Sequence, residues 1–218
     1  MFSACTTSGP ATIDTSPEAE VTFDGLYPVV GGRMDLAWAR ADFDITKYSK
    51  IKLEDAEIEY RPGGEKRQFR DLGPTGHYYV TPRQKERFEE QMSNTFREEL
   101  AKSEHFTIVE EAGPDVLLIR GGLYDVVSYV PPDTTGRSEI FISRIGEATL
   151  VFELRDSESD AILLRAIDRR AAQQVGGRLS NSNTVTNSSE FRRVAREWAT
   201  ILREGLDRFA VPEEVVGE

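Results

Sequence analysis

The feature that most constrains the fold is an amphipathic repeat near the C-terminus. Between residues 187 and 209, apolar side chains recur at intervals of three and four, which is the strongest periodicity in the chain. We expect a helix that begins at Asn187, because Asn187 and Glu190 have the spacing of a capping box, and that ends before Pro212. Such a helix has to bury its apolar stripe against another layer. The stripe consists of Phe191, Val194, Ala195, Trp198, Ile201, Leu202, Leu206 and Phe209.

The opposite face of this helix is charged. Arg193 with Glu197, and Glu204 with Arg208, have the i, i+4 spacing of pairs that support each other along a helix.

A second helix is predicted from Thr81 onward. Thr81 is a suitable N-cap, Pro82 fits the first helical turn, and Gln84 completes a capping box. Behind this start, an apolar residue recurs every fourth position and predicts a single buried stripe. The stripe consists of Phe88, Met92, Phe96 and Leu100.

Five stretches have the composition and alternation of strands. They are 50–60, 106–110, 116–128, 147–154 and 162–171. In the first stretch the apolar phase changes near Asp55, which indicates a bulge. In the third, Gly121 and Gly122 indicate a kink. Ahead of the first strand, Trp38, Phe43 and Tyr48 are better explained as a strap that packs on the core than as a ligand-stacking group.

The order of elements predicts the α+β class. We expect one mixed, mainly antiparallel sheet of about five strands, with both helices packed on one face and the first two strands parallel to each other. The predicted single domain covers residues 23–212. A flexible segment, 1–22, precedes it, and an acidic tail, 213–218, follows it.

Three long irregular stretches are candidate sites, because long loops in compact domains are often functional. If every element reverses direction, the loops 129–146 and 173–187 emerge at one end of the sheet and the loop 61–80 at the other. We therefore expect an interaction site on the paired loops. The candidate residues are Tyr129, Arg137, Arg178, Asn181 and Asn183.

The first five residues, Met1 to Cys5, resemble the cleavage box of a bacterial lipoprotein, in which the cysteine is acylated. Cys5 is the only cysteine, so it has no disulfide partner within the chain. Residues 6–21 have the composition of a flexible tether. Thr6, in place of Asp, favours sorting to the outer membrane. The alternative is a cytoplasmic protein in which Cys5 is incidental.

Charge and composition exclude several functions. The formal net charge of -11 argues against binding of nucleic acid. No apolar run approaches the roughly twenty residues that span a bilayer. His77 and His105 have no metal-like spacing, and no catalytic motif occurs. We therefore expect no catalytic residue, no metal and no cofactor.

Several short runs carry a family resemblance. They are Asp24-Gly25-Leu26, Met34 to Trp38, Asp42 to Ile51, and Gly113 to Leu117. With them the chain resembles a family of Gram-negative lipoproteins of unknown function, domain of unknown function 3313. The resemblance implies a lipid-anchored domain on the periplasmic side of the outer membrane, with no established activity.

Two functional hypotheses follow. The first is a non-catalytic binding or scaffolding module, anchored through an acyl group on Cys5, with an unidentified periplasmic or outer-membrane protein as partner. The second is a small-ligand-binding protein or an enzyme with its site at the loops 129–146 and 173–187, which requires a pocket with convergent polar groups there.

Overall fold

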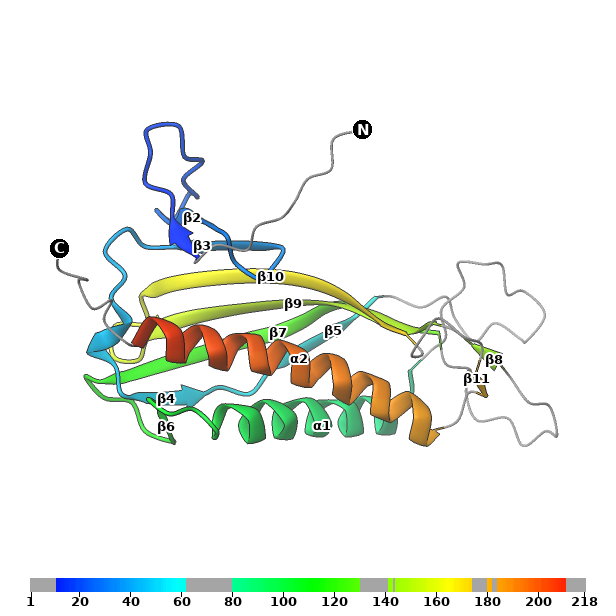
Figure 1. The fold of residues 1–218 in the computed structure, drawn as a ribbon. Helices are drawn as coiled ribbons and strands as arrows, with labels where there is room; N and C mark the ends of the chain where they lie inside the picture. Colours follow the sequence, from blue (N-terminus) through cyan, green and yellow to red (C-terminus); the bar gives the residue numbers. More distant parts are fainter. Residues whose placement is uncertain are drawn as a thin grey trace, which may run out of the picture.

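The computed structural model describes residues 11–61, 80–129, 141–142, 144–173, 180–181 and 184–210. Figure 1 shows a large sheet with two long helices on one face. The strands are β1 (Thr12–Ile13), β2 (Tyr27–Val30), β3 (Leu36–Ala39), β4 (Lys50–Leu53), β5 (Glu57–Tyr60), β6 (Thr107–Val109), β7 (Val116–Ser128), β8 (Phe141–Ile142), β9 (Arg144–Asp156), β10 (Ile162–Gln173) and β11 (Ser180–Asn181). The helices are the short 3₁₀ helix η1 (Ile45–Lys47), α1 (Pro82–Leu100) and α2 (Thr184–Ala210).

The large sheet is mixed, as predicted, but it has nine described strands instead of about five. Their order is β1-β2-β3-β10-β9-β7-β4-β6, and β5 also pairs with β7. The long central strands β7, β9 and β10 are antiparallel, whereas β4 and β5 run parallel to β7. The strands β1, β2 and β3 were not predicted, because they are short and lie in a stretch whose Pro and Gly residues, such as Pro28 and Gly31, indicated turns.

These three strands form an N-terminal lobe, defined here as residues 11–39. β1 falls within the stretch predicted to be a flexible tether, and its residues pair with β2. Part of that stretch therefore belongs to the sheet. The predicted strap is partly a strand as well: Trp38 in β3 lies opposite Arg165 of β10, while Phe43 and Tyr48 pack, partly buried, against the core.

The predicted irregularity in the stretch 50–60 is present as a break between β4 and β5. Leu53 lies opposite Ile119 of β7, and Glu57 lies opposite Gly122. Four steps on this side therefore face three steps on β7, so the break inserts one extra residue. That insertion lets Ile51 and Ile58 contribute to the same core despite their opposite parity in the sequence.

The predicted kink in β7 lies elsewhere. Pairing with β9 passes through Gly121 and Gly122 without a register shift. The shift falls instead between Tyr124 and Val127, where Asp125 adopts a left-handed backbone conformation with φ 55°.

Both helices cover the same face of the sheet, as predicted (Figure 1). α1 has the predicted capping box: the Gln84 amide donates to the Thr81 hydroxyl, and the Thr81 amide donates to the Gln84 side chain at 2.9 Å. Its residues Met92 and Leu100 are buried. Among the described residues, no helix combines the length and the apolar composition needed to cross a bilayer.

α2 begins at Thr184, so the predicted start at Asn187 is wrong by three residues and Asn187 lies inside the helix. Glu190 does not close a capping box there; its carboxylate accepts from the Arg193 guanidinium at 2.9 Å. The predicted apolar stripe is confirmed. Most of its members are buried, namely Val194, Ala195, Trp198, Ile201, Leu202 and Leu206.

Two acidic residues of α2 that were predicted to pair along the helix have partners outside it. Glu197 pairs with Arg170 of β10, and Glu204 pairs with Arg33 of the N-terminal lobe at 2.5 Å. The spacing along the helix therefore did not identify their partners, because tertiary contacts bring longer-range cations within reach.

The long strands extend into the predicted loops. β9 already begins at Arg144 and β10 continues to Gln173, and these two residues pair. Inside the two predicted loops, β8 and β11 pair with each other.

The predicted position of the loop 61–80 is wrong. Because β5 is parallel to β7, the Arg61 amide donates to the Val126 carbonyl at 3.0 Å. The chain therefore leaves β5 at the same end of the sheet at which β7 reaches Tyr129, and not at the opposite end.

Candidate functional site

One predicted site residue has a described side chain. The Tyr129 hydroxyl donates to Glu147 of β9 at 3.0 Å. Asn181 lies in β11, opposite Phe141 of β8. The remaining candidates lie outside the described residues, and so does the predicted lipidation site. These are Arg137, Arg178, Asn183 and Cys5.

Around Tyr129 the sheet carries a charged network, on which the strained Asp125 is central. Arg61 binds Asp125 with two nitrogens, one of them at 2.5 Å, and this contact raises the pKa of the Arg61 guanidinium. Arg169 reaches both Glu147, at 2.9 Å, and Asp125, at 3.6 Å. Acids and cations alternate in this network and hold one another, which is typical of a structural cluster.

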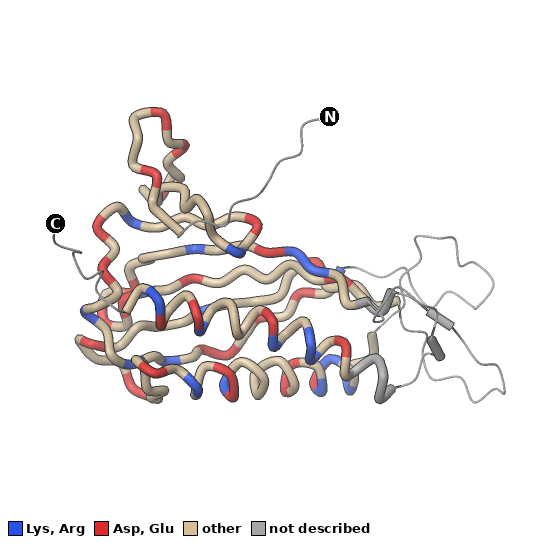
Figure 2. The backbone as a smooth tube through the Cα atoms, in the orientation of Figure 1, with Lys and Arg blue, Asp and Glu red and all other residues tan. Residues whose placement is uncertain are grey.

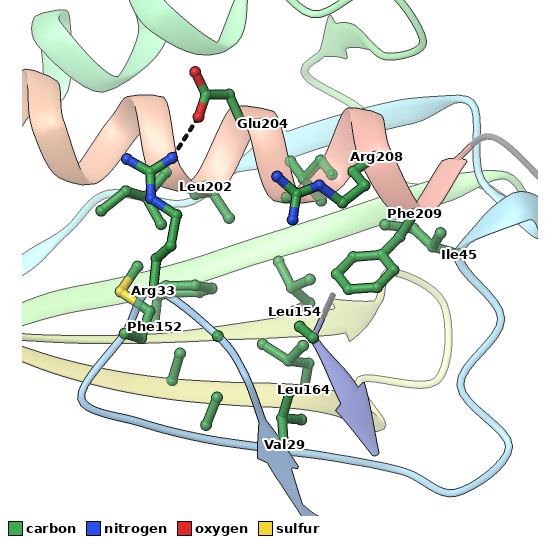
Figure 3. Close-up of a pocket in the computed structure, with 18 of the residues that line it drawn as sticks. Val29, Arg33, Ile45, Phe152, Leu154, Leu164, Leu202, Glu204, Arg208 and Phe209 are labelled. Atoms are coloured by element: carbon green, nitrogen blue, oxygen red, sulfur yellow. Dashed lines mark hydrogen bonds and ion pairs between the residues drawn. The ribbon is translucent and has the colours of Figure 1, made fainter. Parts of the chain in front are cut away.

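A pocket of about 120 Å³ lies at the other end of the molecule. Figure 3 shows it between the C-terminal half of α2 and the strands β9 and β10, with the N-terminal lobe along one side. The pocket was not predicted, because its walls come from the N-terminal lobe, η1, the β9–β10 hairpin and α2, which are separate parts of the sequence.

The walls of the pocket are mostly apolar and follow from the sequence patterns. β9 supplies Phe152 and Leu154, two members of the alternating set that faces the helices. β10 supplies Leu164 on the same face. α2 contributes Leu202 from its apolar stripe, and η1 closes one side with the buried Ile45.

Gly205 forms a bare section of the pocket wall. A Cβ added at Gly205 would have no atom of another segment within 4 Å. Inside a helix, glycine is less favourable than alanine by about 0.5–1 kcal/mol. The residue is therefore not required by crowding, and its local effect is to leave the pocket open at the expense of helix stability.

The lobe side of the pocket is also lined by glycine. Gly31 has φ 77°, in the left-handed region that favours glycine. At its neighbour Gly32, an added Cβ would meet nothing within 4 Å.

Charged groups stand only at the rim. Arg33 reaches across from the lobe to Glu204 on α2 (Figure 3) at 2.5 Å. Arg208, also labelled in Figure 3, has no hydrogen-bond or ion-pair partner among the described residues. Two guanidinium groups and one carboxylate leave the rim with a net positive charge. An apolar interior with a polar rim suits the binding of an apolar group.

Large exposed apolar side chains occur in two parts of the described chain. They belong either to the N-terminal lobe or to the last turn of α2, and they are Val21, Phe23, Val30, Leu36 and Phe209.

The next feature is the distribution of potential metal ligands among the described residues. Across the described ranges, no group of three or more His, Cys, Asp or Glu side chains is placed to hold a metal ion. His105 is exposed, and His77 lies outside the described residues.

Comparison with protein families gives one match. The family described as "Protein of unknown function (DUF3313)" matches residues 21–202. The chain belongs to this family. That description assigns no activity to the family, so membership identifies related proteins but does not assign a function. A comparison with curated proteins finds no match.

Several solved structures are distantly similar to this member of the family. A PelC dodecamer from Paraburkholderia phytofirmans has 14% identity and a TM-score of 0.35, covering 76% of this chain and 96% of its own. A homologue of neuraminyllactose-binding hemagglutinin from Helicobacter pylori has 10% identity and a TM-score of 0.41, covering 77% and 87%. Protein XCC0632 from Xanthomonas campestris has 12% identity and a TM-score of 0.38, covering 76% and 86%. At these values nothing about ligand or assembly transfers to this chain.

Proposed function

We propose that this protein is a non-catalytic binding or scaffolding module of the bacterial envelope, anchored through Cys5, that holds an apolar group of its partner in the pocket beside Gly205. The observation that supports the proposal is the pocket itself, which is apolar, close to 120 Å³, and kept open by a helical glycine. A pocket of this kind is where an interface usually places an aromatic or aliphatic anchor residue.

The pocket has the right size for one such group. An engineered apolar cavity of about 150 Å³ stays dry and binds benzene. The volume of 120 Å³ is slightly smaller, so it suits one aromatic ring or a few methylene groups, and not a whole lipid chain. Burial of a single large apolar side chain stabilises a complex by about 1.5–3 kcal/mol before other terms.

The position of the pocket agrees with the proposed anchor. Ala11, one of the residues that line the pocket, lies six positions after Cys5. Six residues span at most roughly 20 Å when fully extended. An acyl group on Cys5 would therefore keep the pocket close to the surface of the membrane, which we place on the periplasmic side of the outer membrane.

Toluene, which has the ring and the adjoining carbon of a Phe side chain, tests the pocket. We expect saturable calorimetric binding to the full chain and none to Gly205→Met, in which the new side chain fills the space. Arg196→Met is a matched control, because Arg196 is exposed on the same helix and does not line the pocket. Equal binding by all three proteins would contradict the proposal.

The anchor requires a separate test. We expect mass spectrometry of the protein from its native membrane to show a diacylglyceryl group on Cys5. We also expect Cys5→Ser to move the protein from the membrane fraction to the soluble fraction. Recovery of an unmodified N-terminus from the membrane would remove the anchor from the proposal and leave the pocket untouched.

A second candidate function is supported by the charged network at the other end. Binding of a small polar ligand, or an enzymatic activity, at the loops 129–146 and 173–187 would use Tyr129 and Glu147. Replacement of 131–140 and 174–179 by short Gly-Ser linkers tests it. Loss of a small molecule that copurifies with the original chain, detected by native mass spectrometry, would favour this site, and its retention would favour the pocket.

A further inference from the structure

The N-terminal lobe presents one phenylalanine without any contact. Phe23 lies in the loop between β1 and β2, and 99% of its surface is exposed. Figure 1 shows this blue loop projecting beyond the sheet. Full exposure of a ring this large leaves a substantial apolar area in water, which is unfavourable unless another molecule covers it.

The turn that presents Phe23 is firmly held. The Gly25 amide donates to the Thr22 carbonyl at 3.0 Å, and the Leu26 amide donates to the Thr22 hydroxyl at 2.9 Å. Leu26 is buried in the fold, with 1% of its surface exposed. The backbone that carries the ring is therefore held in place before any partner arrives, which reduces the backbone entropy that binding has to overcome.

An ion pair fastens the same turn to the sheet. Asp24 binds Arg165 of β10 at 2.7 Å, and Arg165 also binds Glu153 of β9 at 2.8 Å. Asp24 and Arg165 are each about one-fifth exposed, so the pair is largely removed from solvent. The projecting turn therefore moves with the central strands and is not a loose tip.

We propose that Phe23 of one copy of this chain occupies the pocket beside Gly205 of a second copy. This inference rests on the proposed function, and it names the partner. The ring projects from a firmly held turn, and the pocket is an open recess of matching size, about 120 Å³. The ring does not fill the pocket of its own molecule, because Phe23 is almost completely exposed.

Charge supports the same pairing. Between residues 11 and 32 the lobe contains four acidic residues and no Lys or Arg, and Figure 2 shows acidic positions along the projecting loop. Glu18 and Glu20 have no partner among the described residues. The pocket rim has the opposite sign, with Arg33 and Arg208. Docking of the loop at the rim therefore brings unlike charges together, despite the net negative charge of the whole chain.

The contact allows two types of assembly. The projection and the recess are different surfaces of the chain, so each copy offers one of each to its neighbours. Two copies can exchange the contact reciprocally in a symmetric dimer, or a head-to-tail repeat of the contact can produce a closed ring or an open filament. One buried ring gives a weak contact in dilute solution, and anchoring of all copies in one membrane raises their effective concentration.

Sedimentation of the full chain, from micromolar to about millimolar concentration, tests the proposal. We expect concentration-dependent self-association that weakens at least tenfold in Phe23→Ser and in Gly205→Met. Leu36→Ser is the control, because Leu36 is an exposed apolar residue of the same lobe that does not line the pocket. It should associate like the original chain. Unchanged association of Phe23→Ser or of Gly205→Met would overturn the proposal.

Mixing the two defective variants provides the sharper test. Phe23→Ser keeps its pocket and Gly205→Met keeps its ring, so an equimolar mixture should form a dimer of one copy of each and nothing larger. A mixture that remains monomeric, while the original chain associates, would overturn the contact between Phe23 and the pocket.

Toluene separates the two proposals. Binding of toluene to Phe23→Ser, together with a monomeric original chain at every concentration, would overturn self-association and leave the pocket function standing. If toluene bound neither the original chain nor Phe23→Ser, both the pocket function and self-association through the pocket would be overturned.

Discussion

The two ends of the sheet differ in whether their surface groups have partners within the chain. At the end where β7 reaches Tyr129, acids and guanidinium groups hold one another, with Arg169 joining Glu147 and Asp125. At the other end, a pocket is open beside Gly205 and Phe23 has no contact. The length and polarity of the loops led to the prediction of a site at the first end. The exposed apolar surface indicates a binding site at the second end. Exposed apolar surface is the better indicator of a binding partner, because charged groups that already pair within the chain gain little free energy from binding.

The largest expected effect concerns Asp168, which attaches the N-terminal lobe to the rest of the fold. Its buried carboxylate accepts from the Trp198 indole at 2.7 Å, from Arg170 at 2.6 Å and from the Asp35 amide at 3.1 Å. Asp168→Ala leaves these donors without an acceptor, so the free energy of unfolding should fall by about 3 kcal/mol or more. Denaturant unfolding measures it.

Asp168→Asn is the control for this change. It keeps an oxygen acceptor for Trp198 and removes the charge beside Arg170, so its loss should be clearly smaller. If both variants unfolded like the original chain, the hydrogen bonds to Asp168 would not stabilise the fold.

The next effect concerns Glu99, which joins α1 to α2. Burial disfavours its charged form, but hydrogen bonds from Lys102, Thr200 and Arg203 outweigh burial and lower the pKa of Glu99 below the ordinary 4.5. A lowered pKa in the folded state stabilises the fold above pH 4.5, and this contribution disappears as the pH falls through the folded value. Glu99→Gln should therefore cost about 1–2 kcal/mol at neutral pH.

The sign of the pH dependence decides this prediction. The difference between Glu99→Gln and the original chain should shrink as the solution is acidified below pH 4.5. Thermal unfolding over a series of pH values measures it, and a difference that grew on acidification would show that the carboxylate is not stabilised in the fold.

A smaller effect of opposite sign is expected at Gly205. Gly205→Ala should raise the free energy of unfolding by about 0.5–1 kcal/mol, because alanine favours the helix and its methyl group meets no neighbour. The same methyl group takes space from the pocket, so toluene should bind less tightly. Chemical denaturation of one preparation measures the expected increase in the free energy of unfolding, and calorimetry measures the expected decrease in toluene affinity. A destabilised Gly205→Ala would mean that the position is constrained by packing.

The smallest effect is expected at the charged end. Tyr129→Phe removes one hydrogen bond to Glu147 and should change the free energy of unfolding by about 0.5–1 kcal/mol. It should leave toluene binding unchanged. A large loss of toluene binding in this variant would show that the two ends are coupled and would break the contrast between them.

The sequence predicted those parts of the fold that repeat over many residues. Four turns of apolar spacing identified α1 and α2, and the slip near Asp55 correctly indicated an inserted residue. The strands of the N-terminal lobe were missed because they are short and lie among Pro and Gly residues that indicated turns. The start of α2 was misplaced because a capping pair also occurs inside the helix, at Asn187 and Glu190.

The site was harder to predict than the fold. The pocket depends on where α2 lies over β9 and β10 and on the lobe that covers it, and spacing along the chain contains no such information. One local signal existed: Gly205 interrupts the apolar stripe of a strong helix, and Gly31 with Gly32 interrupts the lobe. Glycine inside a helical pattern, without a cap to explain it, was the clue to a cavity.

The central claim is that the apolar end of the molecule, and not the charged end, is the binding site. The most direct measurement is a titration of the full, ¹⁵N-labelled chain with toluene, followed by amide chemical shifts. We predict saturable shifts confined to residues 31–34, 152–154 and 201–209, which disappear in Gly205→Met. Shifts centred on Tyr129 and Glu147, or no saturable shift at all, would contradict the claim.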